Sequence, residues 1–540
     1  MGIEDFSSDE DRMFRYLVDP GCGPRGEGNW GPMLHPPPAA AKAGLHIRCH
    51  GLPGVPIADA ILRHPFDRTL VTEQPLDIHF IAIGGTGMAP LACLLQEMGH
   101  QVRGSDNPLY PPMSTLLNAA GIEPMVGFDI AHLDPIPDLV VVGNAVPRHN
   151  PQALETERLG IERISMPQAL SRFFLMQRLP LVVAGTHGKT TTTSMASWIY
   201  TACGKDPGFL VGGVPRNLGR SFHQGTGRRF IIEGDEYNAA YFDRGAKFLH
   251  YRPETAILTS VEYDHADLYP DPESLLAAYE AYVALPPEDG LVVACGDSPE
   301  VRKVAAKARC PVVFYGLEEH NDLRPAGPVT SGPEGSRFAV QDPEFGEIEI
   351  HLPMSGLHNV CNLLAVWAVA RRDGLDPHAV ADAFARFQGI KRRLDEVGSH
   401  AGITVIDDFA HHPTAVGKTI AALRAQFPER RIVVAFEPRS LTAGRSFFFE
   451  AYLDAFRDAD RIFLAPIFHA QRLSSEERLD IEGLAATLSD RGVETTCTNS
   501  NEELLAKVLG EARPGDVLVT MSSGKFDDLP PRLLAGLKGT

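Results

Sequence analysis

The residues best suited to chemistry form a glycine-bearing turn between an apolar stretch and a helix start. Residues 181–184 predict a short buried strand, and residues 185–190, Gly-Thr-His-Gly-Lys-Thr, predict a tight turn that opens a helix extending through Tyr200. Free backbone N–H groups and the helix dipole both point at such a turn, which makes it an anion site. Lys189 would add positive charge near the β- and γ-phosphates of a nucleotide, and the Thr190 hydroxyl would lie where Mg²⁺ binds. The pattern favours a nucleotide-phosphate loop over a purely structural glycine turn.

Groups that could hold a metal follow two further apolar stretches. Residues 229–233 predict a buried strand that delivers Glu233 at its end, and residues 255–260 lead into a polar run that contains His265. Because the metal bound to ATP prefers hard oxygen donors, Glu233 is a candidate magnesium ligand. Taken alone, His265 would be a surface histidine, but its place beside a phosphate loop and Glu233 favours a role at the metal site.

A second glycine-rich turn, Gly84-Gly85-Thr86-Gly87, lies within a strand–turn–helix pattern over residues 79–98. The next predicted strand ends in Asp106, which is typical of a dinucleotide-binding unit and would suit a nicotinamide cofactor, although Pro90 replaces the third glycine. The same unit could hold the diphosphate of a UDP-sugar at its helix N-terminus. Asn144, after a further apolar strand, is as suited to capping a turn as to contacting a ligand.

Polar side chains also gather at the start of a strongly helical run over residues 363–372. His358, Asn359 and Asn362 are spaced by about one helical turn, so two of them can face a common ligand. Helix capping by Asn359 is the competing interpretation.

The C-terminal third repeats the alternation of strands and helices. Residues 404–408 predict a strand that ends in two acids, the second being Asp408, and Arg439 follows another buried strand. This alternation predicts a parallel sheet whose loops gather at one edge. His411 and His412 make a poor zinc pair, since adjacent side chains point apart and no third ligand is at hand.

Length and composition set the broad class. The 540 residues, 44% of them hydrophobic, suit three or four globular domains at ~150 residues each. The net charge of −19 argues against nucleic acid as a partner, because binding its backbone needs clusters of Lys and Arg. Eight singly placed cysteines fit reduced thiols in a cytoplasm rather than a zinc framework or a disulfide scaffold. Since no stretch offers ~18 uninterrupted apolar residues, no membrane span is predicted.

Together these patterns predict an α/β protein of three domains behind an N-terminal extension. Residues 1–75 are crowded with proline and glycine, so we expect a flexible extension or a translation start assigned too early. A Rossmann-like domain is expected over residues 76–178, a central phosphate-loop domain over 179–388 and a second Rossmann-like domain over 389–540. We expect a cytoplasmic protein that is a monomer or a weak homo-oligomer.

Taken in order, the motifs resemble those of the Mur ligases, the ATP-dependent amide-forming enzymes of peptidoglycan synthesis. The resemblance spans about residues 77–535 and rests on five stretches: Gly185-Thr-His-Gly-Lys-Thr-Thr191, Glu233-x-Asp235-Glu236, Asp264-His265-x-Asp267, His358-Asn359-x-x-Asn362 and Asp407-Asp408-x-x-His411-His412-Pro413. It implies one domain each for a UDP-sugar, for ATP and for the amino substrate. It also favours UDP over nicotinamide at the first glycine-rich turn.

Three further stretches, residues 104–117, 247–251 and 436–440, are similar to those of family members that act in peptidoglycan recycling. The resemblance implies that a whole tripeptide, L-alanyl-γ-D-glutamyl-meso-diaminopimelate, is joined to UDP-N-acetylmuramate. Ligation of free L-alanine to the same acceptor is the alternative. A non-catalytic nucleotide-binding regulator is an alternative of another class.

The resemblance also implies residue roles, with an acyl phosphate formed from ATP and the lactyl carboxylate of UDP-N-acetylmuramate. Lys189, Glu233 and His265 would be catalytic, and Thr190, Glu233 and His265 would hold Mg²⁺. ATP would contact Gly185, Thr186, His187, Gly188, Lys189, Thr190, Thr191, His358, Asn359, Asn362, Arg392, Arg393 and Asp408. The UDP-sugar would contact Gly84, Gly85, Thr86, Gly87, Met88, Asp106 and Asn144, and the peptide would contact His411 and Arg439.

The sequence departs from the family pattern in three places, the smallest being Gly234, where an alanine is usual. Many relatives carry a carbamylated lysine shortly after the His265 motif, but this sequence has no lysine between Lys247 and Lys303. Lys525 stands where the most similar members carry glycine, which leaves recognition of the far end of the peptide open.

Overall fold

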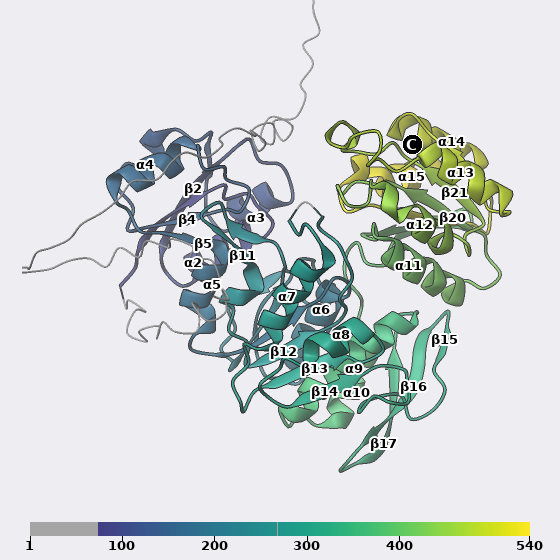
Figure 1. The fold of residues 1–540 in the computed structure, drawn as a ribbon, viewed down its shortest axis with the longest axis horizontal. Coiled ribbons are helices and arrows are strands. Elements are labelled where there is room, and N and C mark those ends of the chain that lie inside the picture. Colours follow the sequence, from purple (N-terminus) through teal and green to yellow (C-terminus); the bar gives the residue numbers. More distant parts are fainter. Residues whose placement is uncertain (1–73, 267, 540) are drawn as a thin grey trace, which may run out of the picture. The chain divides into compact units, whose positions relative to one another are not determined.

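The computed structural model describes residues 74–266 and 268–539 (Figure 1). Nearly all of the expected N-terminal extension, residues 1–73, therefore lies outside the described residues, as does Asp267. Within the described part, helices and strands alternate and build sheets of mainly parallel strands. This confirms the expected α/β class with three domains.

The first sheet is parallel and has five strands in the order β3-β2-β1-β4-β5. Its strands are β1 (Asp77–Ile81), β2 (Gln101–Asp106), β3 (Met125–Val126), β4 (Leu139–Val142) and β5 (Arg163–Ser165), and the helices of this part are α2 (Met88–Glu97), α3 (Met113–Ala119), α4 (Pro151–Leu159) and α5 (Met166–Leu170). The strand predicted over residues 79–83 ends at Ile81, because the amides of Ala82 and Ile83 both donate to the Ser105 carbonyl and the chain turns there. The strand order reverses at β1, the place where open α/β sheets bind ligands.

The second sheet has seven strands in the order β14-β13-β12-β6-β9-β7-β8, and β8 alone among them runs antiparallel to its neighbour. Its strands are β6 (Leu179–Ala184), β7 (Gly208–Leu210), β8 (Phe222–His223), β9 (Arg229–Gly234), β12 (Thr255–Leu258), β13 (Leu291–Cys295) and β14 (Val312–Tyr315). The helices are α6 (Lys189–Ala202), α7 (Pro272–Val283), α8 (Pro299–Ala305), α9 (Leu357–Arg372) and α10 (Pro377–Ala385). A hairpin joins β10 (Asn238–Ala240) to β11 (Asp243–Ala246).

A small antiparallel sheet also belongs to the second domain. β15 (Thr330–Gly332), β16 (Gly335–Asp342) and β17 (Gly346–Leu352) form a separate three-stranded sheet. Alternate residues of β16 and β17 are buried and belong to the same apolar core as α6, α9 and α10. This sheet therefore packs with the second domain.

The third sheet has six strands in the order β18-β19-β23-β20-β21-β22. Its strands are β18 (Asp395–His400), β19 (Ile403–Asp408), β20 (Ile432–Phe436), β21 (Arg461–Leu464), β22 (Glu494–Cys497) and β23 (Val517–Met521), and its helices are α11 (Pro413–Gln426), α12 (Phe449–Ala455), α13 (Ile481–Asp490), α14 (Asn501–Glu511) and α15 (Leu529–Lys538). The expected parallel sheet is found for five of these strands, and β18 adds an antiparallel edge. Apolar side chains cover both of its faces.

Candidate active site

The phosphate loop follows β6, which lies between β9 and β12, so the loops after these three strands meet at one edge. Gly185 has a φ of 131° and Gly188, just before α6, a φ of 84°, values that strain a residue with a Cβ. A Cβ on Gly185 would also lie 2.3 Å from Thr259 Oγ1. The Thr186 amide donates to the Ser260 carbonyl at 3.0 Å, which fastens the loop to the segment after β12. The strand, turn and helix predicted here are confirmed.

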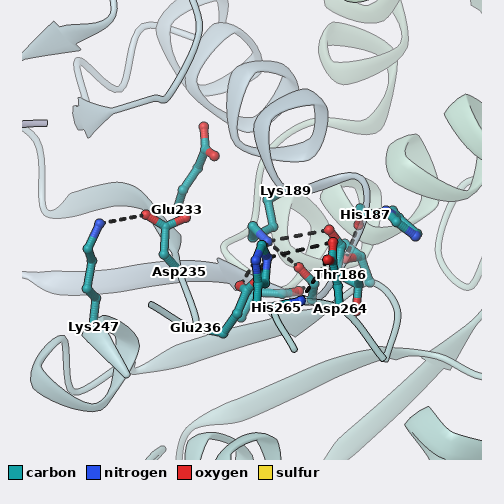
Figure 2. A network of polar contacts seen from close by, with 12 residues as sticks. Thr186, His187, Lys189, Glu233, Asp235, Glu236, Lys247, Asp264 and His265 are labelled. Carbon is teal, nitrogen blue, oxygen red and sulfur yellow. Dashed lines mark hydrogen bonds and ion pairs between the residues drawn. The ribbon is translucent and has the colours of Figure 1, made fainter. Parts of the chain in front are cut away.

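Lys189 begins α6, and its ammonium is buried against Glu236. Nζ lies 3.0 Å from Glu236 Oε2 and donates to the Gly185 carbonyl at 2.6 Å (Figure 2). Burial alone would lower the pKa of Lys189, but the carboxylates of Glu236 and Asp235 raise it. Burial would likewise raise the pKa of Glu236, yet Lys189 and His265 bring it to about 2. The lysine is therefore held in its charged form at the phosphate loop.

His265 completes this buried group of charges. Its Nε2 lies 2.9 Å from Glu236 Oε1 and 3.7 Å from Asp264 Oδ2. Although burial lowers it, the pKa of His265 is raised overall by these two carboxylates. Sequence reasoning assigned no role to Glu236, which is 2% exposed. A lysine in such a loop needs a buried counter-ion, and the acid three residues after Glu233 could have been recognised on that ground.

Thr190 and Glu233 form a separate polar group. The Thr190 hydroxyl donates to Glu233 Oε2 at 3.0 Å, and Arg393 Nη2 donates to Thr190 Oγ1 at 3.2 Å. Hydroxyl and carboxylate oxygens are hard donors, and burial raises the pKa of Glu233, so a divalent cation would stabilise its ionised form. This donor set fits Mg²⁺. The Glu233 carboxylate points away from Lys189 and His265 in Figure 2, so His265 as a ligand of the same ion stays a prediction.

Of the two neighbouring arginines, Arg393 is the one that contacts the phosphate loop. Arg392 binds within its own domain, where its Nε donates to Asp407 Oδ2 at 3.2 Å. Asp408 accepts a hydrogen bond from the Leu394 amide at 2.7 Å. Its carboxylate therefore fixes the chain that carries Arg393, and contacts of Arg392 and Asp408 with ATP stay predictions.

The start of α9 also contacts the phosphate loop. Asn362 Oδ1 accepts from the Thr192 hydroxyl at 3.2 Å, and a Cβ on Gly188 would lie 2.7 Å from the same oxygen. Asn359 Nδ2 donates to a backbone carbonyl four residues earlier, at 2.9 Å. Burial lowers the pKa of His358 to about 4 and keeps its ring neutral. Asn362 is thus placed beside the loop, while adenine contacts by all three residues stay predictions.

The glycine-rich turn after β1 opens onto a cavity of about 320 Å³. Five of the seven residues predicted to hold a UDP-sugar line it: Gly85, Thr86, Gly87, Met88 and Asn144. The other two, Gly84 and Asp106, are joined by a 2.7 Å hydrogen bond from the Gly84 amide to the Asp106 carboxylate. Asp235 and Lys247, 3.2 Å apart, also line the cavity, and sequence reasoning missed both (Figure 2).

The two residues predicted to contact a peptide, Arg439 and His411, contact different neighbours in the structure. Arg439 follows β20, with its guanidinium 3.7 Å from the centre of the Phe468 ring and 3.6 Å from Glu437 Oε2. Gly524 approaches it so closely that a Cβ there would lie 1.9 Å from Arg439 Nε. His411 instead bonds through Nδ1 to a backbone carbonyl two residues earlier, at 3.0 Å. Both peptide contacts stay predictions.

The described residues hold a candidate metal-binding group that sequence reasoning did not find, and it includes His412 but not His411. The fold brings His187 of the phosphate loop and Glu262, after β12, to His412, and the ligand atoms of all three lie within 4.8 Å of one another. His412 therefore does have further candidate ligands at hand. They escape sequence reasoning because they are far apart along the chain.

Family comparison accounts for all three domains. Residues 77–178 match the model described as Mur ligase family, catalytic domain, residues 183–370 match the Mur ligase middle domain, and residues 392–524 match the Mur ligase, glutamate ligase domain. The chain belongs to the Mur ligase family. Its resemblance to these ATP-dependent, amide-forming ligases is thereby confirmed.

This Mur ligase is similar over most of its length to two kinds of relative. It is 38% identical to the UDP-N-acetylmuramate–L-alanyl-γ-D-glutamyl-meso-2,6-diaminoheptandioate ligase of Escherichia coli K12, over 85% of this chain and 98% of that protein. It is 33% identical to the UDP-N-acetylmuramate–L-alanine ligase of Nitratidesulfovibrio vulgaris DP4, over 85% of this chain and 98% of that protein. Among solved structures, a murein peptide ligase from Psychrobacter arcticus 273-4 is 33% identical with a TM-score of 0.65, over 86% of this chain and 99% of that one.

Across the described residues of this Mur ligase, every helix is too short or too polar to span a membrane.

Proposed function

We propose that this Mur ligase joins L-alanyl-γ-D-glutamyl-meso-diaminopimelate to UDP-N-acetylmuramate while ATP is converted to ADP and phosphate. Amide formation in water is uphill, so the lactyl carboxylate of the acceptor must first be activated. That carboxylate attacks the γ-phosphate of ATP, which gives an acyl phosphate and ADP. The α-amine of the peptide then attacks the acyl carbon and expels phosphate. We place this reaction of peptidoglycan recycling in the cytoplasm.

The observation that carries the proposal is the run of acids at the end of β9. Glu233 faces Thr190 of the phosphate loop, Asp235 lines the cavity at the glycine-rich turn, and Glu236 pairs with Lys189. One short segment therefore links the candidate ATP site to the candidate UDP-sugar site. Such a link supports direct transfer of a phosphoryl group between two bound substrates.

The charged groups suit phosphoryl transfer, in which catalysis is mainly positioning and charge neutralisation. Lys189 neutralises the transferring phosphoryl group, and Glu236 keeps the lysine charged and in place. Thr190 and Glu233 would hold Mg²⁺, which would supply further charge neutralisation. Arg393 adds a cation from the third domain. The third domain thus contacts the phosphate loop, and with both substrates bound this contact would help to exclude water from the acyl phosphate.

Similarity to the tripeptide ligase of Escherichia coli favours the tripeptide as the amine substrate. Ligation of free L-alanine is the second candidate, because an L-alanine ligase is similar over the same share of the chain. ADP release with UDP-N-acetylmuramate distinguishes them when L-alanine, a dipeptide and the tripeptide are compared at equal concentrations. We expect the tripeptide to support by far the fastest release. Preference for L-alanine would overturn the substrate, and no release with any amine would favour a nucleotide-binding regulator instead.

A further inference from the structure

Three side chains with metal-binding atoms meet where the phosphate loop approaches the start of α11. His187 Nε2 lies 3.5 Å from Glu262 Oε2, and His412 Nδ1 lies 3.7 Å from the same oxygen. The ligand atoms of the three residues all lie within 4.8 Å of one another. In a tetrahedral site with bonds of about 2.1 Å, ligand atoms are about 3.4 Å apart, so small side-chain shifts would suffice to bind an ion.

Hydrogen bonding within the protein does not account for this group. The Nε2 atoms of both His187 and His412 are buried without a hydrogen-bond partner in the described part of the chain. The Nδ1 atom of His412 accepts only a long contact from the Thr414 amide, at 3.3 Å. Burying unpartnered polar atoms costs free energy, and here two imidazoles with such atoms are held with ring centres 4.7 Å apart. An ion bound to His187 Nε2, the atom that faces Glu262, would relieve this cost for that ring.

The Glu262 carboxylate is held in place by the third domain. Thr414 Oγ1 donates to Glu262 Oε2 at 2.5 Å, so the carboxylate is fixed beside the two imidazoles.

We propose that His187, Glu262 and His412 bind a divalent transition-metal ion of the Zn²⁺ type. Two imidazoles and one carboxylate suit zinc, whereas Mg²⁺ prefers oxygen ligands alone and is expected at Thr190 and Glu233. Water would complete the coordination. Because His187 and Glu262 belong to the second domain and His412 caps α11 of the third, the ion would tie the phosphate loop to the third domain.

Titration of the full-length, nucleotide-free protein with Co²⁺ tests this site, because Co²⁺ replaces Zn²⁺ and reports its coordination by visible absorption. The wild-type protein should bind one Co²⁺ with the spectrum of a four- or five-coordinate ion that has nitrogen ligands. Glu262→Gln and His412→Gln should each weaken Co²⁺ binding by more than ~100-fold. Loss of a residue that only hydrogen-bonds to a metal ligand already lowers metal affinity by ~10–100-fold. His351→Gln is the matched control, because His351 bonds to the Glu334 carbonyl in a different sheet.

Thermal unfolding supplies a second readout that does not depend on a spectrum. Zn²⁺ should raise the melting temperature of the wild type and of His351→Gln, and should leave those of Glu262→Gln and His412→Gln unchanged. Metal-free melting curves and circular dichroism establish that each variant is folded. Equal Co²⁺ affinity in the wild type and both ligand variants would overturn the proposal. Absence of the expected spectrum at one equivalent of Co²⁺ in the wild type would overturn it as well.

Discussion

At the scale of single residues, the candidate site depends on buried charges that compensate one another. Lys189, Glu236 and His265 form one such group, in which Glu236 contacts the other two at 3.0 and 2.9 Å. The lysine that we propose as catalytic therefore also stabilises the fold through its contact with Glu236. Substitutions there should therefore change stability together with turnover, and the two effects can be separated.

Lys189→Met should reduce ADP release by at least ~100-fold, the scale of losing one preorganised charge-stabilising group. It should also destabilise the fold by about 3–5 kcal/mol, because Glu236 is left buried without its main partner. Steady-state ADP release and denaturant unfolding measure the two effects. In the double variant Lys189→Met/Glu236→Gln, much of the stability should return while turnover stays low. Turnover near that of the wild type in Lys189→Met would rule out the assigned role.

Arg439→Ala should lower kcat/KM for the tripeptide by ~10- to 150-fold, because a charge-assisted hydrogen bond to a peptide carboxylate is worth ~1.5–3 kcal/mol. The KM values for ATP and UDP-N-acetylmuramate should hardly change. Arg457→Ala is the matched control, since that arginine of the same domain is 73% exposed. An unchanged kcat/KM in Arg439→Ala would place the peptide pocket elsewhere and leave the ligase proposal intact.

At the scale of elements, the loops after three neighbouring strands, β9, β6 and β12, position the candidate site residues. Local sequence patterns predict the ends of such strands well. β9 begins at the expected residue 229 and ends one residue after the expected Glu233, and α6 ends only two residues after the predicted Tyr200. Both elements combine a continuous apolar or helical pattern with clear turn residues. β18 could not be predicted in the same way, because its exposed, polar sequence carries little strand pattern and its pairing with β19 decides it.

Most contacts between elements could not be predicted from the sequence, although the need of Lys189 for a counter-ion could have pointed to Glu236. The pairing of Glu236 with Lys189 and the meeting of His187, Glu262 and His412 both depend on how strands are ordered in the sheet. Strand order places residues side by side that are far apart along the chain. Residue types and spacing therefore predicted which loops hold the candidate site residues. The fold determined which of their side chains form ion pairs and which lie close enough together to bind one ion.

Gly188→Ala should test how closely α9 and the phosphate loop fit. At a φ of 84° an added Cβ is strained by ~1–2 kcal/mol, and here it would also lie 2.7 Å from Asn362 Oδ1. Gly160→Ala is the control, because its φ is 68° but open space surrounds it. Both variants should lower the melting temperature, and only Gly188→Ala should weaken ATP binding in calorimetric titrations. Equal ATP affinity in the two variants would contradict the proposed position of the nucleotide.

At the scale of the whole molecule, buried neutral histidines should make the fold sensitive to acid. Burial lowers the pKa values of His79, His358 and His412 from 6.5 to about 4 each. The unfolded chain would take up these protons below pH ~6.5 and the folded chain would not, so the stability present above that pH is lost towards pH ~4. The raised pKa of His265 opposes part of this loss.

Melting temperatures measured between pH ~7.5 and ~4.5 should therefore fall as the pH falls. His79→Gln removes one of the three titrating rings, and its side chain can keep a polar contact with Gln152 in the first domain. The fall should be shallower in this variant than in the wild type. An identical slope would show that His79 does not contribute.

The central claim concerns the whole molecule, because it requires two substrate sites to act on one carboxylate. UDP-N-acetylmuramate labelled with ¹⁸O in both oxygens of its lactyl carboxylate, together with ATP and the tripeptide, tests it most directly. Mass spectrometry should find one ¹⁸O atom in each phosphate released and one retained in the new amide, as an acyl phosphate requires. Unlabelled phosphate, or ¹⁸O recovered in AMP, would contradict the mechanism.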